Sequence, residues 1–198
     1  MKQQRLGITG CIGSGKSVVS AILRILNIPI YDSDSEAKRL MHSNPCIRRE
    51  LTEEFGTECY PDGKNLDRKH LAEIIFNNPD ALRRVNHIVH PRVKQDFEKW
   101  CKDHHCPIVG IESAILYEAG LEQSVDHVIV VDANIETCIT RATTRSKATR
   151  EEIAKRLKSQ SSIQVTAKKA AYTIHNDNNI ALLPQIARIL VNIKNKPH

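Results

Sequence analysis

One glycine-rich stretch constrains the fold of this chain more than any other feature, and its residues are Gly10, Cys11, Ile12, Gly13, Ser14, Gly15, Lys16 and Ser17. The stretch fits the pattern G-x-x-x-x-G-K-[ST], follows an apolar segment that contains Leu6 and Ile8, and precedes a helical pattern. Glycines let the backbone turn with positive φ and aim successive N–H groups inward, and the following helix adds the positive end of its dipole. The sequence therefore predicts a phosphate-binding loop between a strand and a helix.

Two side chains of this loop indicate what it binds. Lys16 can reach the β- and γ-phosphates of a nucleotide, and the Ser17 hydroxyl can ligate Mg²⁺. A flexible Gly/Ser turn with an incidental lysine is the alternative, but it leaves the flanking strand and helix patterns unexplained. We therefore predict a nucleotide and Mg²⁺ as ligands.

The composition is that of a soluble globular protein. Hydrophobic residues make up 40% and charged residues 26% of the 198 residues, a length that suits one domain with an inserted or appended subdomain. No apolar run approaches the length of a membrane span, and residues 1–5 lead directly into a strand pattern, which leaves no room for a signal peptide. We expect a cytoplasmic protein without a membrane partner.

The six cysteines show no paired spacing, and one of them, Cys11, lies in the predicted loop, where a disulfide would distort the phosphate site. We expect free thiols in a reducing compartment. Residues 101–106 offer soft metal ligands, but no second half at matching spacing accompanies them, so a helix end is the better interpretation.

The net charge of +6 raises nucleic acid as a partner, because basic surfaces attract phosphate backbones. However, the basic residues are dispersed, and aromatic residues make up only 4% of the chain, too few for a platform that stacks bases. An enzyme that binds polyanionic ligands also needs surplus Lys and Arg. We therefore expect no nucleic-acid partner.

An apolar run at residues 28–31 predicts a second strand, which is followed by Asp32-Ser33-Asp34. The strand ends and the phosphate loop share one edge of an open parallel sheet, so these carboxylates can organise Mg²⁺ or accept a proton from an attacking hydroxyl. A helix cap by Ser33 or Asp34 is the alternative, and one aspartate can cap while the other takes part in the chemistry.

Later apolar runs predict three more strands, and alternation with helices predicts an α/β fold with a parallel sheet; the runs are residues 107–112, 125–132 and 172–175. The first two end in Glu112 and Asp132, which are placed like acids that organise a metal ion beside a phosphate loop. Asp132 can equally cap the helix that begins near Asn134. The carboxylate that organises the metal ion can thus be Glu112, Asp132 or one of the pair Asp32 and Asp34.

Residues 35–106 show an almost wholly helical pattern of short segments separated by Pro and Gly. This length exceeds what a strand–helix–strand crossover needs, so we predict a helical insertion that receives the second substrate. His90-Pro91 predicts a helix start, with Pro91 at the first helical position and His90 in a structural place beside the cap.

A basic helical hairpin is predicted at residues 141–160. Arg141 and Arg145 lie one helical turn apart, and Thr149 with Glu152 forms a capping box that starts a second helix. We predict a mobile lid that brings arginines onto the transferring phosphoryl group and excludes water, with a solvated helix face as the alternative.

In the order of its motifs the chain resembles the dephospho-CoA kinase family over nearly its whole length; the motifs are Gly10–Ser17, Asp32-Ser33-Asp34, Leu66-Asp67-Arg68, His90-Pro91, Ile115-Leu116-Tyr117-Glu118, Arg141 and Arg145 with Arg156 and Gln160, and Ile174-His175-Asn176-Asp177. The resemblance implies ATP-dependent phosphorylation of the ribose 3′-hydroxyl of dephospho-coenzyme A, the last step of coenzyme A synthesis. It also implies a three-layer P-loop fold with five parallel strands. Three parts are implied. The nucleotide-binding core comprises residues 1–34, 107–140 and 161–198. Residues 35–106 form a helical insertion that binds the CoA substrate, and residues 141–160 form a lid.

The resemblance also implies roles for individual residues. Asp34 is the expected catalytic base and a further candidate for the metal beside Ser17, and Lys16, Arg141 and Arg145 are expected at the phosphates. The turn at Asn176 and Asp177 is expected near adenine. Substrate contacts are expected from Asp32, Asp34, Lys38, His90 and Arg156.

Four positions depart from the family pattern. Cys11 replaces the usual second glycine of the loop, and a cysteine is tolerated there if its φ is negative. Lys38 replaces the usual arginine, which can bind a substrate group through two nitrogens, whereas a lysine cannot. Ala114 replaces a proline. Asn178 replaces a glycine, although asparagine still tolerates the left-handed region.

Other functions fit parts of the same pattern. They are a kinase of nucleosides or nucleotides on the same core, a nucleic-acid-dependent ATPase, and a nucleotide-binding switch that transfers no group. A panel of phosphoryl acceptors distinguishes them. The sequence does not predict an oligomeric state.

Overall fold

The computed structural model describes residues 2–76, 78–146, 148–159 and 170–195. The chain divides into two compact units, which are Met1–Ile30 with His104–His198 and Tyr31–Asp103. We call them the sheet unit and the helical unit and describe each separately. Across these described ranges, no helix combines the length and the apolar character that crossing a membrane requires.

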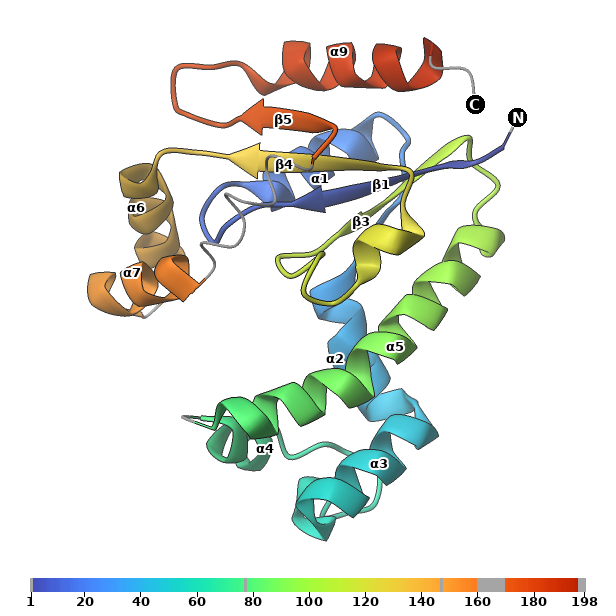
Figure 1. Ribbon diagram of the computed structural model, residues 1–198, viewed down its shortest axis with the longest axis vertical. Helices are drawn as coiled ribbons and strands as arrows, with labels where there is room; N and C mark the ends of the chain where they lie inside the picture. Colours follow the sequence, from blue (N-terminus) through green and yellow to red (C-terminus); the bar gives the residue numbers. More distant parts are fainter. Residues whose placement is uncertain (1, 77, 147, 160–169, 196–198) are drawn as a thin grey trace. The chain divides into compact units, whose positions relative to one another are not determined.

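A five-stranded sheet carries the order β2-β3-β1-β4-β5, and its strands are β1 (Gln4–Thr9), β2 (Ile30–Asp32), β3 (Ile108–Glu112), β4 (His127–Asp132) and β5 (Tyr172–His175) (Figure 1). The central strand β1 runs parallel to both neighbours, with Ile8 opposite Glu112 on one side and Ile129 on the other. Strand β5 pairs in parallel with β4, with Ile174 opposite Val131. The predicted five-stranded parallel sheet is thereby confirmed.

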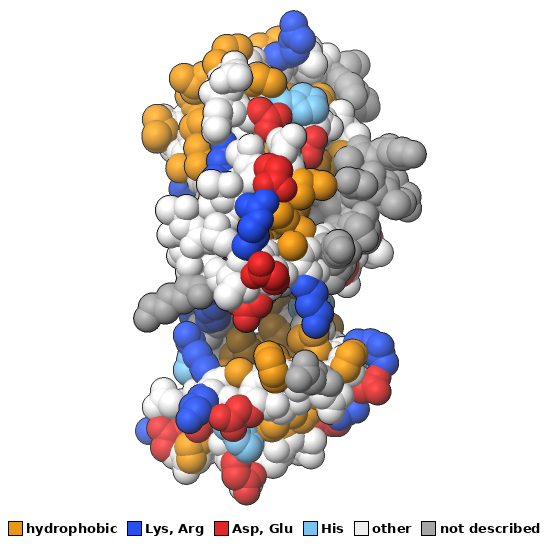
Figure 2. All heavy atoms as spheres, turned by 90° about the vertical axis from the view of Figure 1, so that its left-hand side faces the viewer, with side chains coloured by type: hydrophobic (Ala, Val, Ile, Leu, Met, Phe, Trp, Pro, Cys, Tyr) orange, Lys and Arg blue, Asp and Glu red, His pale blue; other side chains and the backbone are white. Residues whose placement is uncertain are grey.

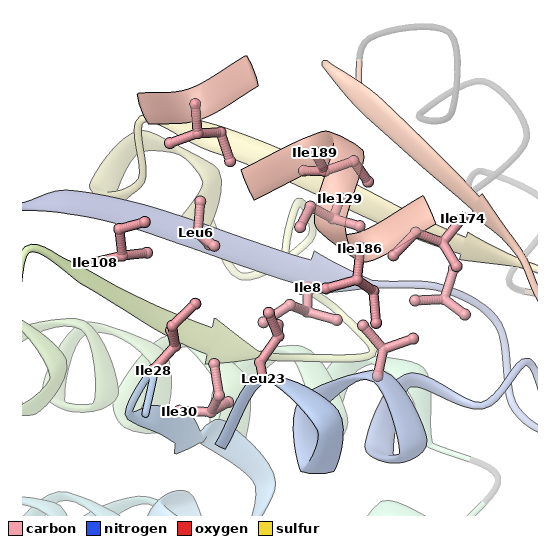
Figure 3. Close-up of a cluster of buried hydrophobic side chains, with 13 residues drawn as sticks. Leu6, Ile8, Leu23, Ile28, Ile30, Ile108, Ile129, Ile174, Ile186 and Ile189 are labelled. Atoms are coloured by element: carbon pink, nitrogen blue, oxygen red, sulfur yellow. The ribbon is translucent and has the colours of Figure 1, made fainter. Parts of the chain in front are cut away.

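Two helices cover one face of this sheet, namely α1 (Lys16–Ile25) and α9 (Leu182–Asn195). Figure 3 shows Leu6 and Ile8 of β1 among Leu23 of α1 and Ile186 of α9, and all four side chains are buried. Each such side chain contributes roughly 1.5–3 kcal/mol when it leaves water. The closely packed aliphatic cluster therefore holds β1 firmly, and β1 leads directly into the glycine-rich loop.

The opposite face of β1 is covered by the segment that follows β3. A Cβ atom on Gly7 would lie 2.8 Å from Leu116 and 3.2 Å from Val125, so a larger residue would push this segment away. The segment includes the 3₁₀ helix η2 (Leu121–Ser124), in which Leu121 is buried.

Two further helices of the sheet unit form a hairpin, α6 (Ile135–Arg145) and α7 (Arg150–Ser159). Asn134 caps α6 by accepting a hydrogen bond from the N–H of Glu136, so the alternative cap by Asp132 is wrong. The predicted capping box of α7 is present, because Thr149 Oγ1 accepts from the N–H of Glu152 and Glu152 Oε2 accepts from the N–H of Thr149.

The helical unit contains α2 (Ser33–Ser43), α3 (Pro45–Phe55), the 3₁₀ helix η1 (Thr57–Cys59), α4 (Arg68–Ile75) and α5 (Pro79–Asp103). Helices α2, α3 and α4 all pack against α5. Near the end of α5, Phe97 and Trp100 lie around Tyr31, with ring centroids 5.4 Å and 5.6 Å from that of Tyr31. Helix α5 is thus the support of this unit. It ends at Asp103, as the helix-end interpretation of residues 101–106 predicts.

The prediction that a helix starts at His90-Pro91 is wrong, because Pro91 lies inside the continuous helix α5. A proline there lacks the N–H that would bond to the carbonyl one turn earlier, which normally bends or ends a helix. Residues on both sides of it, including Ile88 and Val93, are buried and hold this part of the helix in the core. Tertiary packing therefore overrides the local preference.

Candidate active site

The glycine-rich loop connects the end of β1 at Thr9 with the start of α1 at Lys16. Gly13 and Gly15 have φ values of 79° and 96°, in the left-handed region that a side chain strongly disfavours. Among the described residues, Asn27 is the one non-glycine residue with positive φ, so Cys11 fits the backbone of the loop without such strain. Asn178, which replaces a glycine of the family pattern, therefore has a negative φ and does not use the left-handed conformation.

Close packing gives a second reason for glycine at these positions. A Cβ atom on Gly13 would overlap the backbone carbonyl of Cys138 in α6, and one on Gly15 would overlap the side-chain amide of Asn176. The loop therefore rests against the first turns of α6 on one side and against the residue after β5 on the other.

Asn176 joins three parts of the sheet unit. Its side-chain Nδ2 donates a 2.7 Å hydrogen bond to the carbonyl of Ser14, and its N–H donates one of 2.7 Å to the carbonyl of Asp132. Its own carbonyl accepts a 3.0 Å bond from Nη1 of Arg141, whose Nη2 donates to Asn178 Oδ1 at 2.9 Å. Arg141 is thus held beside the loop, near Gly15.

Lys16 lies across the loop that precedes it. Its Nζ donates to the carbonyls of Gly10 and Cys11 at 2.8 Å and 3.0 Å. Helix α1 has Gly15 as its N-cap without a side-chain cap, and its first turn, all of which is described, contains no acidic residue. The first N–H groups of α1 and the lysine ammonium together form a receptor for an anion.

Hard oxygen ligands that suit Mg²⁺ lie in the same unit. Ser17 is exposed in the first turn of α1, Glu112 ends β3 beside β1, and Asp132 ends β4. Asp132 Oδ2 lies 3.7 Å from Nδ1 of His175. Within the described ranges, no group of three or more His, Cys, Asp or Glu side chains gathers around a common point. A hydroxyl and separate carboxylates match a cation that keeps most of its waters, as Mg²⁺ does.

Asp32, the last residue of β2, and Asp34, in the first turn of α2, have separate roles in the helical unit. Asp32 caps α2, because its Oδ1 accepts from the N–H groups of Asp34 and Ser35 at 3.1 Å and 3.3 Å. The alternative cap by Ser33 or Asp34 is therefore wrong. Asp34 is exposed in the first turn of α2, and because Lys16 belongs to the sheet unit, the pairing of Asp34 with the phosphates stays a prediction.

The other predicted substrate residues of the helical unit are Lys38 and His90. Lys38 is exposed on α2, and the next residue, Arg39, forms ion pairs with Glu36 and with Asp96, the latter at 2.6 Å. His90 is half-buried on α5, where burial lowers its pKa because the charged form loses water. The substrate contacts of Lys38 and His90 therefore stay predictions.

The last predicted residues lie on or after the helical hairpin. Arg145 is exposed at the end of α6, whereas the side chain of Arg156 and the whole of Gln160 lie outside the described residues. Asp177 Oδ1 accepts a 2.8 Å bond from the N–H of Asn134 and so fixes the start of α6. The link from Asn176 to Ser14 and the packing of Cys138 on the loop have no signal in the sequence, because both join segments that are far apart in the chain.

Comparison with known proteins agrees with this geometry. Residues 4–181 match the family model of dephospho-CoA kinase. A dephospho-CoA kinase from Bacteroides fragilis is 40% identical over 98% of this chain and 95% of its own length, and one from Porphyromonas gingivalis is 43% identical over 96% and 95%.

A solved structure points the same way. The dephospho-CoA kinase from Campylobacter jejuni superposes with a TM-score of 0.70 at 25% identity, over 97% of this chain and 98% of that one. The sequence motifs, the phosphate loop and the full-length similarity agree, and the chain belongs to the dephospho-CoA kinase family.

Proposed function

We propose that this chain transfers the γ-phosphoryl group of ATP to the ribose 3′-hydroxyl of dephospho-coenzyme A, giving coenzyme A and ADP. The observation that carries the proposal is the phosphate loop, where the Lys16 ammonium and the uncapped start of α1 form one anion site. Membership in the dephospho-CoA kinase family supplies the acceptor.

Lys16, the loop N–H groups and Arg141 stabilise the charge that develops on the transferring phosphoryl oxygens. The hydrogen bonds of Arg141 to the turn after β5 support this role, because they restrict its guanidinium to the neighbourhood of Gly15. Asp34 accepts the proton of the ribose hydroxyl as that oxygen attacks phosphorus. Its exposure leaves the carboxylate accessible to a substrate.

Mg²⁺, when bound, neutralises charge on the β- and γ-phosphates. The Ser17 hydroxyl would hold it together with water, and the carboxylates available to orient those waters are Glu112, Asp132, Asp32 and Asp34. Asn176 and Asp177 are placed near adenine in this proposal, and Ile12 with the other loop residues surrounds the phosphates.

The remaining assignments concern the acceptor and the closing of the site. Residues 35–106 bind dephospho-coenzyme A, with contacts from Asp32, Lys38 and His90, and residues 141–160 form a lid that brings Arg145 and Arg156 to the phosphates. The rest of the chain is the nucleotide-binding core. We place the protein in the cytoplasm, where ATP is available.

An acceptor panel tests the reaction directly. ADP release is measured with dephospho-coenzyme A, nucleosides, nucleoside monophosphates and single-stranded polynucleotide, and the product is identified by mass. We expect ADP release when dephospho-coenzyme A is the acceptor and none above background with the other acceptors of the panel. Figure 2 shows basic and acidic side chains mixed on one face rather than separated by sign, which does not favour a polynucleotide track there. Turnover that depends on polynucleotide, or on a nucleoside instead, would overturn the proposal.

Two substitutions test the assigned roles. Asp34→Asn should lower kcat by about 10²–10⁴-fold, the usual contribution of a general base, and leave ATP binding nearly intact. Lys16→Ala should weaken both ATP binding and turnover. The matched controls are Asp103→Asn and Lys194→Ala, because both residues are exposed at helix ends and belong to none of the predicted motifs. Turnover of Asp34→Asn equal to that of Asp103→Asn would exclude the base.

A further inference from the structure

Two thiols meet where the phosphate loop rests on α6. The sulfur atoms of Cys11 and Cys138 lie 3.4 Å apart, although the residues are 127 positions apart in the chain. Cys11 is partly exposed in the loop, whereas Cys138 is fully buried. All six cysteines are described, and each is a free thiol.

The surroundings make the two thiols chemically unequal. The hydrogen bond from the Cys138 thiol and the positive charge of Lys16 lower the pKa of Cys11 to about 7, against the opposing effects of burial and of Asp132. The same hydrogen bond and burial raise the pKa of Cys138. At neutral pH a large fraction of Cys11 is therefore thiolate beside a protonated thiol, which is the arrangement of an attacking cysteine and its resolving partner.

We propose that Cys11 and Cys138 form a reversible disulfide that switches off the phosphate loop when a hydroperoxide is present. The Cys11 thiolate attacks one peroxide oxygen, the O–O bond breaks, and Cys11 becomes a sulfenic acid while hydroxide leaves and takes up a proton. The Cys138 sulfur then attacks Cys11 Sγ, the S–O bond breaks, and water leaves with the Cys138 proton. Two thiols lose two electrons in total, and hydrogen peroxide is reduced to two molecules of water.

The new bond would change the loop that holds the phosphates. A disulfide brings the sulfur atoms from 3.4 Å to about 2.05 Å, so the loop and α6 must shift relative to each other by about 1 Å or the side chains must rotate. Rotation has little space, because Gly13 already rests on the Cys138 backbone and Cys138 is buried.

The carbonyl of Cys11 also accepts a hydrogen bond from Lys16 Nζ, so a shift of Cys11 moves the lysine's anchor. Displacement of a catalytic group by about 1 Å can cost on the order of 10²-fold in rate. We expect a loss of this size in kcat/KM for ATP, an expectation that rests on the proposed kinase function.

The experiment treats the full-length, reduced protein with a small molar excess of hydrogen peroxide at pH 7 and then removes the peroxide. Peptide mapping under non-reducing conditions should recover a peptide that links Cys11 to Cys138, without reference to activity. Turnover with ATP and dephospho-coenzyme A should fall and should return after dithiothreitol. Activity of the untreated protein tests the proposed function separately, so a failure of that function cannot be mistaken for a failure of the disulfide.

Cys138→Ser removes the resolving thiol and leaves a hydroxyl in its place beside the Ala133 carbonyl, whose oxygen lies 3.6 Å from the Cys138 sulfur. Before peroxide treatment, the Cys138→Ser variant should turn over like the wild type. After peroxide treatment, it should not form the disulfide that dithiothreitol reverses in the wild type. Cys46→Ser, at an exposed cysteine of the helical unit, is the matched control and should respond to peroxide like the wild type.

Two results would overturn the proposal. One is oxidation of Cys11 without a peptide linked to Cys138, and the other is a linked peptide with undiminished turnover. The wild-type peptide map decides the pairing even if Cys138→Ser fails to fold.

Discussion

Replacing Asn176 by alanine tests how the phosphate loop is held. The Asn176 side chain is 8% exposed and donates a 2.7 Å hydrogen bond to the Ser14 carbonyl. Asn176→Ala leaves that carbonyl without this donor, a change that typically costs about 1–3 kcal/mol. For a chain of this size, 1 kcal/mol lowers Tm by about 2–4 °C, so we expect Tm to fall by roughly 2–12 °C.

Thermal unfolding followed by circular dichroism measures the loss, and ADP release measures its effect on the site. Asn179→Ala is the control, because Asn179 is exposed in the same turn, and surface changes of this kind stay within about ±0.5 kcal/mol. Asn176→Asp should be worse than Asn176→Ala, since a carboxylate would face the Ser14 carbonyl, and two acceptors repel each other. If Asn176→Ala matches Asn179→Ala in Tm and in kcat/KM for ATP, the role assigned to Asn176 is wrong.

Three further changes test other parts of the sheet unit. Gly13→Ala should lower kcat/KM for ATP on the order of 10²-fold, because the residue has a φ of 79° and its new Cβ would displace the Cys138 carbonyl; wild-type kinetics would contradict this packing. Thr149→Ala removes the cap of α7 and should destabilise that helix by about 0.5–2 kcal/mol, seen as faster hydrogen exchange of its amides but not of α1. The alkylation rate of Cys11 should rise with pH and reach half its maximum near pH 7, because the thiolate is the reactive form; a midpoint near 8.5, that of an ordinary cysteine, would refute the lowered pKa.

Features set by neighbouring residues were predictable from the sequence. The phosphate loop depends on glycines at fixed spacing, and the cap of α7 depends on Thr149 and Glu152 three positions apart, so both signals are local. The prediction at Pro91 was wrong because the local signal, a proline, is outweighed by apolar packing along α5 that no short window contains. The sequence left the cap of α2 open, since Asp32, Ser33 and Asp34 are all good N-cap residues, and the structure selects Asp32.

Much of the site depends on contacts between distant segments. Asn176 and Ser14 are 162 positions apart and meet because β5 and β1 lie on either side of β4, which no local pattern specifies. The same is true of Cys138 beside Cys11. The roles of Asp34, Lys38 and His90 stay predictions, because they depend on how a substrate meets both units.

The support of the loop also limits how a lid could move. Arg141, where the predicted lid begins, is bonded through both terminal nitrogens to Asn176 and Asn178, in the same turn that holds the loop through Ser14. Freeing it would break two hydrogen bonds, at a net cost of about 0.5–1.5 kcal/mol each. Because Arg141 and Arg145 belong to the same continuous helix α6, a lid that keeps both bonds hinges where α6 ends, after Arg145, and closure should move α7 relative to Arg141. Arg141 is then held in place before any ligand binds, and Asn176 is the residue on which both Arg141 and the loop depend.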